Sequence, residues 1–253
     1  MKIKTSAVLL ALIALPLLLI GCSRDVDFEQ LKQKSAEEIF ALGQKAMNEK
    51  RYSDAVKLFE ELEKLHPYSK LTMRAQLLAG ECNYYSKKFD EAIASFEEFV
   101  KAHPTHKSVP YALYMVGFIN YKQMPIIERD QDYTIEALEY FNRLREEYPS
   151  SEYSTKAEKM VAELREHLAG REVYVAKYYM KRKSYAAAIG RLNTVVESYA
   201  GIAHVPEAMH RLVECYIAIG TMAEARVVHA SLLRQYPQSK WTAYAEALIS
   251  RYK

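Results

Sequence analysis

Apolar and small residues recur along most of the chain with the spacing of helical faces. Residues 36–67 and residues 73–104 follow the same order: a glycine, an aromatic residue, an alanine, a phenylalanine and a closing proline. Gly43 lies 12 residues before Ala55, and the second segment keeps this interval. Small residues at both positions allow two antiparallel helices to approach closely, and proline stops the second helix because it has no N–H to continue the hydrogen-bond ladder. The pattern therefore predicts a repeated pair of helices.

Five such units follow one another. The 12-residue interval recurs from Ala176 to Ala188 and from Val213 to Ala225, and the regular period between units is 37 residues. Periods of this size are typical of solenoids. A helix–turn–helix unit with small, aromatic and proline positions resembles the tetratricopeptide repeat (TPR). The predicted fold is therefore all-α, a solenoid of five TPR units.

Two departures from the period predict features of their own. The third unit carries 8 extra residues between its helices, in or near residues 123–133. Between the third and fourth units, 14 extra residues keep the apolar spacing of a helix, and Ser151 or Ser154 would cap its start. We predict one long helix from about Tyr153 to Lys183 that joins repeats 3 and 4. Two helices divided at Gly170 are the alternative.

The start of the chain has a different pattern. Lys2 and Lys4 precede an almost wholly apolar run from Ala7 to Ile20. A helix of that length rises about 20 Å, which is short of the roughly 30 Å hydrocarbon core of a bilayer. A positive start, an apolar run and a small residue at the end indicate a secretory signal.

The end of this run, LIGC, resembles a bacterial lipobox. The resemblance implies that residues 1–21 are a lipoprotein signal peptide and that Cys22 carries N-palmitoyl and S-diacylglycerol groups. Residues 22–34 would then be a lipid-anchored linker, and two or more acyl chains give stable anchoring. Ser23 resembles the outer-membrane sorting choice, which implies the periplasmic face of the outer membrane. A free cysteine beside a weak signal anchor is the alternative.

Charge and cysteine content narrow the range of functions. The chain has 35 basic and 32 acidic residues and no basic stripe, so we expect no nucleic-acid partner. Cys82 and Cys215 lie in apolar helical patterns far apart in the sequence. Buried free thiols are favoured over a disulfide, although an oxidising periplasm would permit one.

Catalytic motifs are absent from the sequence. It contains no P-loop, no G-x-G-x-x-G, no G-x-S-x-G and no H-E-x-x-H. His103 and His106, in the sequence HPTH, are predicted to be exposed loop residues rather than metal ligands. We therefore expect no enzyme, no metal and no cofactor beyond the acyl groups on Cys22.

The resemblance to the TPR also predicts a groove that binds extended segments. In the usual repeat, the second, fifth, ninth and twelfth positions of the first helix face this groove. Counted back from each glycine in the first three units, these positions include six aromatic residues and one arginine: Phe40, Arg74, Tyr84, Tyr111, Tyr114, Phe118 and Tyr121. Aromatic faces suit apolar or aromatic side chains, and Arg74 suits a carboxylate. The alternative is that some of these side chains pack in the core.

A lipobox followed by five repeats resembles the BamD family of outer-membrane protein assembly factors, which are lipoproteins of the β-barrel assembly machine. Three segments carry the resemblance: HPTHKSVPYALYMVGFINY, IERDQDYTIEALEYFNRLREEYPSSEYSTKAE and VAKYYMKRKSYAAAIGRLNTVVESY. The insert in the third unit is shorter than in some members, and Ala200 stands where many members have proline.

The resemblance implies a scaffold that aids recognition, folding and insertion of outer-membrane proteins. Residues 35–150, repeats 1–3, would receive the C-terminal signal of unfolded outer-membrane proteins. Residues 151–253, repeats 4 and 5, would contact the periplasmic POTRA domain of BamA nearest the membrane, and other Bam lipoproteins are further expected partners. Arg191 matches the contact arginine of the family and would pair with a partner carboxylate. A solvated helix charge is the alternative for Arg191.

Two other functions remain open at this point. One is a TPR lipoprotein scaffold of another envelope machine, for pilus assembly or cell-division coordination. The other is an envelope hydrolase, which would need a nucleophile or metal constellation that the sequence does not show.

Overall fold

The structure is a computed structural model that describes residues 28–252. The predicted signal peptide, Cys22 and the first part of the linker lie outside the described residues. The helices are α1 (Phe28–Leu31), α2 (Ala36–Asn48), α3 (Tyr52–Leu65), α4 (Thr72–Tyr85), α5 (Phe89–Ala102), α6 (Val109–Lys122), α7 (Asp132–Glu147), α8 (Glu152–Lys181), α9 (Tyr185–Ser198), α10 (Val205–Ala218), α11 (Met222–Gln235), α12 (Lys240–Ile249) and the 3-10 helix η1 (Ser250–Tyr252).

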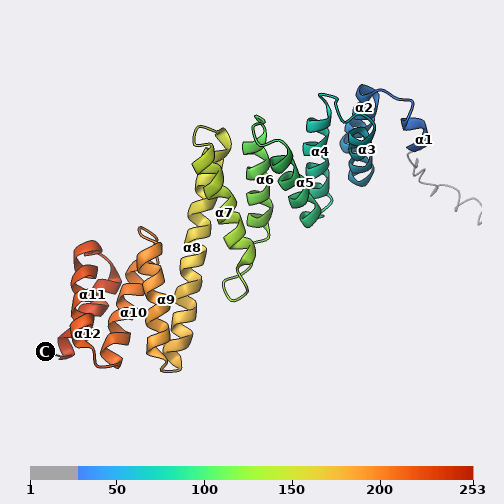
Figure 1. The fold of residues 1–253 in the computed structure, drawn as a ribbon. Helices are drawn as coiled ribbons and strands as arrows, with labels where there is room; N and C mark the ends of the chain where they lie inside the picture. Colours follow the sequence, from blue (N-terminus) through green and yellow to red (C-terminus); the bar gives the residue numbers. More distant parts are fainter. Residues whose placement is uncertain (1–27, 253) are drawn as a thin grey trace, which may run out of the picture.

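Helices α2 to α11 form five pairs that stack in one direction, so the described part of the chain is an elongated solenoid (Figure 1). The first helix of each pair, helix A, is α2, α4, α6, α8 or α10, and the second, helix B, follows it. The prediction of an all-α solenoid of five repeats is confirmed. The 8-residue insert of the third unit lies in the loop between α6 and α7, as predicted.

Glycine and phenylalanine fix the distance between the helices of the first three pairs. A Cβ atom built on Gly43 of α2 would lie 2.4 Å from the ring of Phe59, which is 1 % exposed. The next two pairs repeat this contact with Cβ distances of 3.0 and 2.7 Å: Gly80 with Phe96, and Gly117 with Phe141. Helix A therefore has no room for a side chain at this position, because the phenylalanine ring of helix B fills the space.

The turn from helix A to helix B uses a left-handed residue in four of the five units. Its φ is 59°, 61°, 58° and 82° at Lys50, Lys87, Lys183 and Gly220. In the first unit, the N–H groups of Lys50 and Arg51 donate to the carbonyls of Met47 and Ala46, and the other three units have the corresponding bonds. These bonds satisfy carbonyls that the end of helix A would otherwise leave without a partner.

Helix B ends two residues before a proline in four units. The residues before proline have φ between −134° and −130° and ψ between 54° and 57°: His66, His103, Tyr148 and Tyr236. A proline disfavours the helical conformation for the residue in front of it, which explains these ends.

Helix α8 is one unbroken helix of 30 residues, about 45 Å long. Ser151 caps its start by accepting a hydrogen bond from the Tyr153 N–H, whereas Ser154 donates to the Tyr148 carbonyl at 2.6 Å. The alternative of two helices divided at Gly170 is wrong. A Cβ atom on Gly170 would lie 2.9 Å from Nε2 of His204, so this glycine allows a close contact rather than a break.

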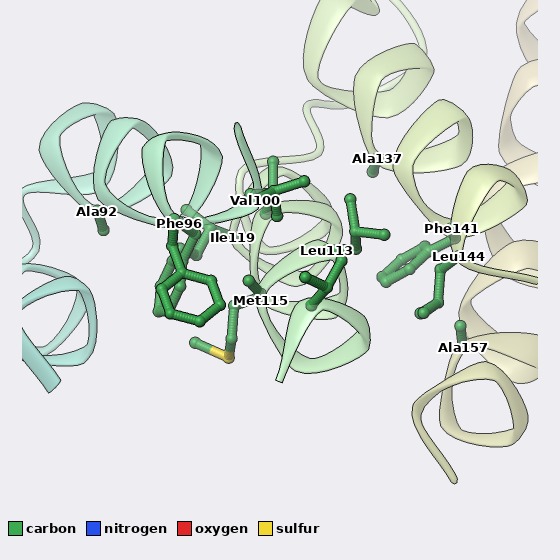
Figure 2. Close-up of a cluster of buried hydrophobic side chains, with 14 of the residues drawn as sticks. Ala92, Phe96, Val100, Leu113, Met115, Ile119, Ala137, Phe141, Leu144 and Ala157 are labelled. Carbon is green, nitrogen blue, oxygen red and sulfur yellow. The ribbon is translucent and has the colours of Figure 1, made fainter. Parts of the chain in front are cut away.

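The core consists of three clusters, and α8 belongs to two of them. Ala157, Val161 and Leu164 from its first half join the central cluster, in which Phe96 and Phe141 lie on opposite sides of α6 (Figure 2). Val173 and Ala176 from its second half join the C-terminal cluster. Because one rigid helix is shared by both clusters, it sets the orientation of units 4 and 5 relative to units 1–3 (Figure 1).

Short helices cover both ends of the described solenoid. Leu31 of α1 is 2 % exposed and packs in the N-terminal cluster, so the end of the predicted linker is part of the folded domain. At the other end, α12 buries Ala245 and Thr242 against the last pair. Solenoids need such terminal elements because the outermost repeat otherwise leaves an apolar face in water.

Candidate functional site

Five aromatic side chains from three A helices form a continuous row, here called the aromatic row. Its members, in spatial order, are Tyr84 of α4, Phe118 and Tyr114 of α6, Tyr153 of α8 and Tyr111 of α6. Successive ring centroids are 6.0, 5.8, 5.5 and 5.4 Å apart, and the Phe118 and Tyr114 rings are stacked at 14°. All five side chains are half-buried, so each packs on one side and stays accessible on the other.

Burial raises the pKa of two phenols of the row, Tyr111 and Tyr114. The Tyr111 hydroxyl donates to Oε1 of Glu81 at 2.6 Å. Burial, and then this hydrogen bond, raise the pKa of Tyr111 far above its ordinary value. Burial also raises the pKa of Tyr114, while the positive charge of Lys156 acts in the opposite direction. These two phenols are therefore uncharged at neutral pH.

Two lysines lie over the rings at the sides of the row. Nζ of Lys122 is 5.2 Å from the Phe118 ring centroid, and Nζ of Lys156 is 4.7 Å from that of Tyr153. Both side chains are exposed, and Lys156 also pairs with Glu152 at 2.8 Å. The quadrupole of an aromatic ring attracts an ammonium group over its face, so these contacts favour one position for each lysine. An anion bound next to the row would therefore lie near the positive charge of Lys122 or Lys156.

The structure brings together four of the seven predicted groove residues: Tyr84, Tyr111, Tyr114 and Phe118. Phe40 is 5 % exposed and packs against Phe59, so it belongs to the core and is not part of the accessible surface. Arg74 is exposed, with its guanidinium 5.3 Å from the Phe40 ring centroid. Tyr121 donates a hydrogen bond to Glu163 of α8, and this bond is the main cause that raises its pKa.

Sequence reasoning missed Tyr153 and both lysines. Tyr153 is the second residue of α8 and directly precedes Ser154, the residue that hydrogen-bonds the end of α7. The sequence PSSEYS, residues 149–154, could have predicted the position of Tyr153. A proline followed by a serine cap marks the start of a helix, and the first turn of that helix lies beside the preceding unit. The lysines carry no pattern of their own, since exposed lysines occur throughout the chain.

Arg191, the predicted partner contact, lies on α9 and is exposed. Its guanidinium is 3.2 Å from a carboxylate oxygen of Glu172 on α8, and the two side chains are 49 % and 19 % exposed. The arginine is therefore held by an intramolecular ion pair, while half of its surface remains open to solvent.

The two histidines of HPTH lie in the loop between α5 and α6, as predicted, but the prediction that they are exposed is wrong. Both are half-buried because their rings pack on Phe99, with centroids 5.1 Å away for His103 and 5.4 Å for His106. His103 also contacts Oε1 of Gln76 at 3.0 Å. Within residues 28–252, no group of three or more His, Cys, Asp or Glu side chains is placed to hold a metal ion.

Cys82 and Cys215 are buried free thiols, as predicted. Burial raises the pKa of Cys82 to about 12 and that of Cys215 to about 11, so neither is a thiolate at neutral pH. In the described part of the chain, no helix combines the length and the apolar character needed to cross a bilayer.

Comparison with solved structures finds TPR proteins at low sequence identity. The TPR2AB domain of yeast Sti1 in complex with pHSP90 has a TM-score of 0.44 and 13 % identity, over 86 % of this chain and 85 % of that one. A thermophilic TPR protein of Thermus thermophilus has a TM-score of 0.37 and 20 % identity, over 85 % of this chain and all of that one.

Comparison with curated sequences finds longer and closer matches. The outer membrane protein assembly factor BamD of Caulobacter vibrioides is 30 % identical over 246 residues, which cover 96 % of this chain and 81 % of the relative. The BamD of Rickettsia prowazekii is 28 % identical over 250 residues, 99 % of each chain. Residues 32–231 match the family described as YfiO, outer membrane lipoprotein. The chain therefore belongs to the YfiO family of outer membrane lipoproteins, together with relatives named outer membrane protein assembly factor BamD.

Proposed function

We propose that this protein is a scaffold that takes part in the assembly of outer-membrane proteins. Membership of an outer membrane lipoprotein family and relatives named BamD over nearly the whole chain support this role. These names do not favour a scaffold for pilus assembly or cell division. They describe an assembly factor rather than an enzyme.

The finer part of the proposal is a lipid anchor at Cys22 on the periplasmic face of the outer membrane. N-palmitoyl and S-diacylglycerol groups on this residue would hold the solenoid at the membrane, because two or more acyl chains anchor a protein stably. The lipobox supports the anchor, and Ser23 supports the outer-membrane destination.

The aromatic row is the proposed binding site for the C-terminal signal of unfolded outer-membrane proteins. An extended segment presents apolar or aromatic side chains every second residue, about 6.5 Å apart, which matches the 5.4–6.0 Å steps between the rings of the row. A chain terminus also carries a carboxylate, which Lys122 or Lys156 would attract. This combination of rings and lysines is the observation that carries the proposal.

Arg191 is the proposed contact to a POTRA domain of BamA. A partner carboxylate would replace or share the ion pair with Glu172, since the guanidinium has five donors and half of its surface is open. Other Bam lipoproteins are proposed as further partners of the same assembly.

The binding proposal is tested with a fluorescent peptide that copies the last strand of a barrel protein and ends in an aromatic residue with a free carboxylate. Fluorescence anisotropy with the full chain in detergent gives the affinity. We expect Tyr114→Ala with Phe118→Ala to weaken binding about tenfold or more, because buried aromatic contacts dominate such interfaces. In a separate measurement with the wild-type protein, amidation of the peptide's C-terminus should also weaken binding, because it removes the carboxylate.

The matched control is Tyr178→Ala, which removes a tyrosine that is 50 % exposed on α8 outside the row. Circular dichroism verifies that each variant is folded. If the double variant binds the peptide as tightly as the wild type, the substrate site lies elsewhere.

A further inference from the structure

A second groove lies where the two halves of the solenoid meet, and it is separate from the aromatic row. Side chains at 3- and 4-residue intervals along one face of α8 form its floor, from Glu163 through Gly170 to Lys177. The loop after α6 forms one wall, and His204 with Glu207 forms the other. Its volume is about 630 Å³, within the ~300–1,000 Å³ that ligand-binding clefts usually have. This cleft is here called the junction groove.

Apolar side chains line the middle of the junction groove. Met124 and Ile127 come from the α6–α7 loop, and Val173 and Tyr174 come from α8. Tyr174 is 42 % exposed, and Met124 and Ile127 are half-buried, so the groove offers apolar surface that the solenoid itself does not cover. Apolar surface in a cleft favours the side chains of a partner, because their burial removes both surfaces from water.

Carboxylates exceed cations along the same groove. Glu163 and Glu166 have side chains that are 42 % and 41 % exposed, whereas Glu207 is only 16 % exposed and is paired with Arg211 at 3.1 Å. Lys177 lies 3.8 Å from Glu207 at the far end. Two carboxylates therefore remain open to solvent one turn of α8 apart.

The nearby positive groups do not neutralise these two carboxylates fully. Lys159 is 3.7 Å from Glu163, but its side chain is 88 % exposed, so this pair is weak in water. His204 Nε2 is 3.5 Å from one carboxylate oxygen of Glu166, whose side chain nevertheless stays 41 % exposed. His167 lines the groove too, and burial lowers its pKa, so it adds no positive charge there.

We propose that the junction groove binds an extended polypeptide segment of a partner protein, with apolar side chains in the middle and a lysine or arginine placed over Glu163 and Glu166. The dimensions fit: the 14 residue steps of α8 from Glu163 to Lys177 rise about 21 Å, the length of roughly six extended residues. The charge fits as well, because an excess of accessible carboxylates selects a basic segment and rejects an acidic one.

The occupant would contact both halves of the molecule at once. Ile127 lies inside the third unit, between α6 and α7, whereas His204 and Glu207 belong to the fifth. Helix α8 is the element that packs in the core of both halves. A bound segment therefore adds a second link between the halves and restricts bending of α8. Gly170 matters here because it allows His204 to approach the floor of the groove.

The test uses a fluorescein-labelled peptide of seven residues that alternates leucine with arginine, and the full chain in detergent. The informative variant is Glu163→Gln with Glu166→Gln. It removes both charges and keeps an oxygen that accepts the hydrogen bonds from the Tyr121 hydroxyl and the Ala203 N–H. The matched control is Glu98→Gln with Glu158→Gln, which removes two exposed charges outside the groove.

Fluorescence anisotropy should show binding to the wild type that the groove variant weakens about tenfold and the control leaves unchanged. Ile127→Asn, which removes apolar surface without adding a charge, should also weaken binding, whereas Tyr114→Ala with Phe118→Ala should not, which separates this site from the aromatic row. No binding to the wild type, equal loss in the control, or equal binding by a peptide with glutamate in place of arginine would overturn the proposal.

Discussion

Replacement of glycine by alanine is expected to have opposite effects at two helix positions of this protein. Gly43 lies inside α2, where a Cβ would meet three ring atoms of Phe59 at 2.4, 2.8 and 2.9 Å. Gly190 lies inside α9, where a Cβ would meet nothing within 4 Å. Both positions are helical, so the intrinsic preference of alanine for a helix is the same at each.

The magnitudes follow from two opposing contributions to the free energy of unfolding. Alanine in a helix interior is about 1 kcal/mol more favourable than glycine. Overpacking of a tight core costs typically ~1–3 kcal/mol, and the upper end applies at Gly43 because the Phe59 ring is buried on all sides. We therefore expect Gly190→Ala to stabilise the protein by about 0.5–1 kcal/mol and Gly43→Ala to destabilise it by about 2 kcal/mol.

Thermal unfolding followed by far-UV circular dichroism measures both effects. In a domain of this size 1 kcal/mol corresponds to roughly 2–4 °C in Tm, so the two variants should move Tm in opposite directions. Hydrogen exchange should locate the loss in Gly43→Ala to α2 and α3, because repeats in a solenoid contact only their neighbours. Gly43→Ala combined with Phe59→Leu should recover part of the loss. If Gly43→Ala alone were as stable as the wild type, the close contact would not control this helix pair.

Three further predictions test the turn, the partner contact and the anchor. Gly220→Ala should lower stability by about 1 kcal/mol in a thermal or urea titration, because alanine is strained at a φ of 82°; an unchanged or higher Tm contradicts this. Arg191→Glu should reduce co-purification of BamA at matched expression without unfolding the chain, since it places a second carboxylate beside Glu172. The control is Arg145→Glu, on the exposed side of α7. Equal recovery of BamA with both variants would show that Arg191 is not part of the interface. Cys22→Ala should leave the protein unprocessed or mislocalised in membrane fractions, and a fully processed outer-membrane form would refute the lipobox.

Much of the fold follows from local rules that the sequence states directly. The glycine and phenylalanine positions define the helix pair, because only a residue without a side chain admits the ring. Proline ends helix B by acting on the residue before it. The long helix α8 was also predictable, since its apolar spacing continues through Gly170 without a proline.

The candidate site was predictable only in part, because burial decides which side chains of a helix face remain accessible. Phe40 and Tyr114 occupy the same register position of their repeats, yet Phe40 is covered by its own unit and Tyr114 stays half-open beside Tyr153. Whether a ring is covered depends on the size and angle of the neighbouring unit, which the repeat pattern does not specify.

The sequence by itself determined the repeat unit, the number of units and the long connecting helix, because each depends on contacts within about forty residues. The tertiary structure alone decided where units far apart in the sequence meet. Tyr153 joins the aromatic row because the start of α8 packs in the central cluster beside α6. The α6–α7 loop and His204 line the same junction groove only because α8 fixes the angle between the two halves. That angle results from packing at both ends of α8, and no local pattern encodes it.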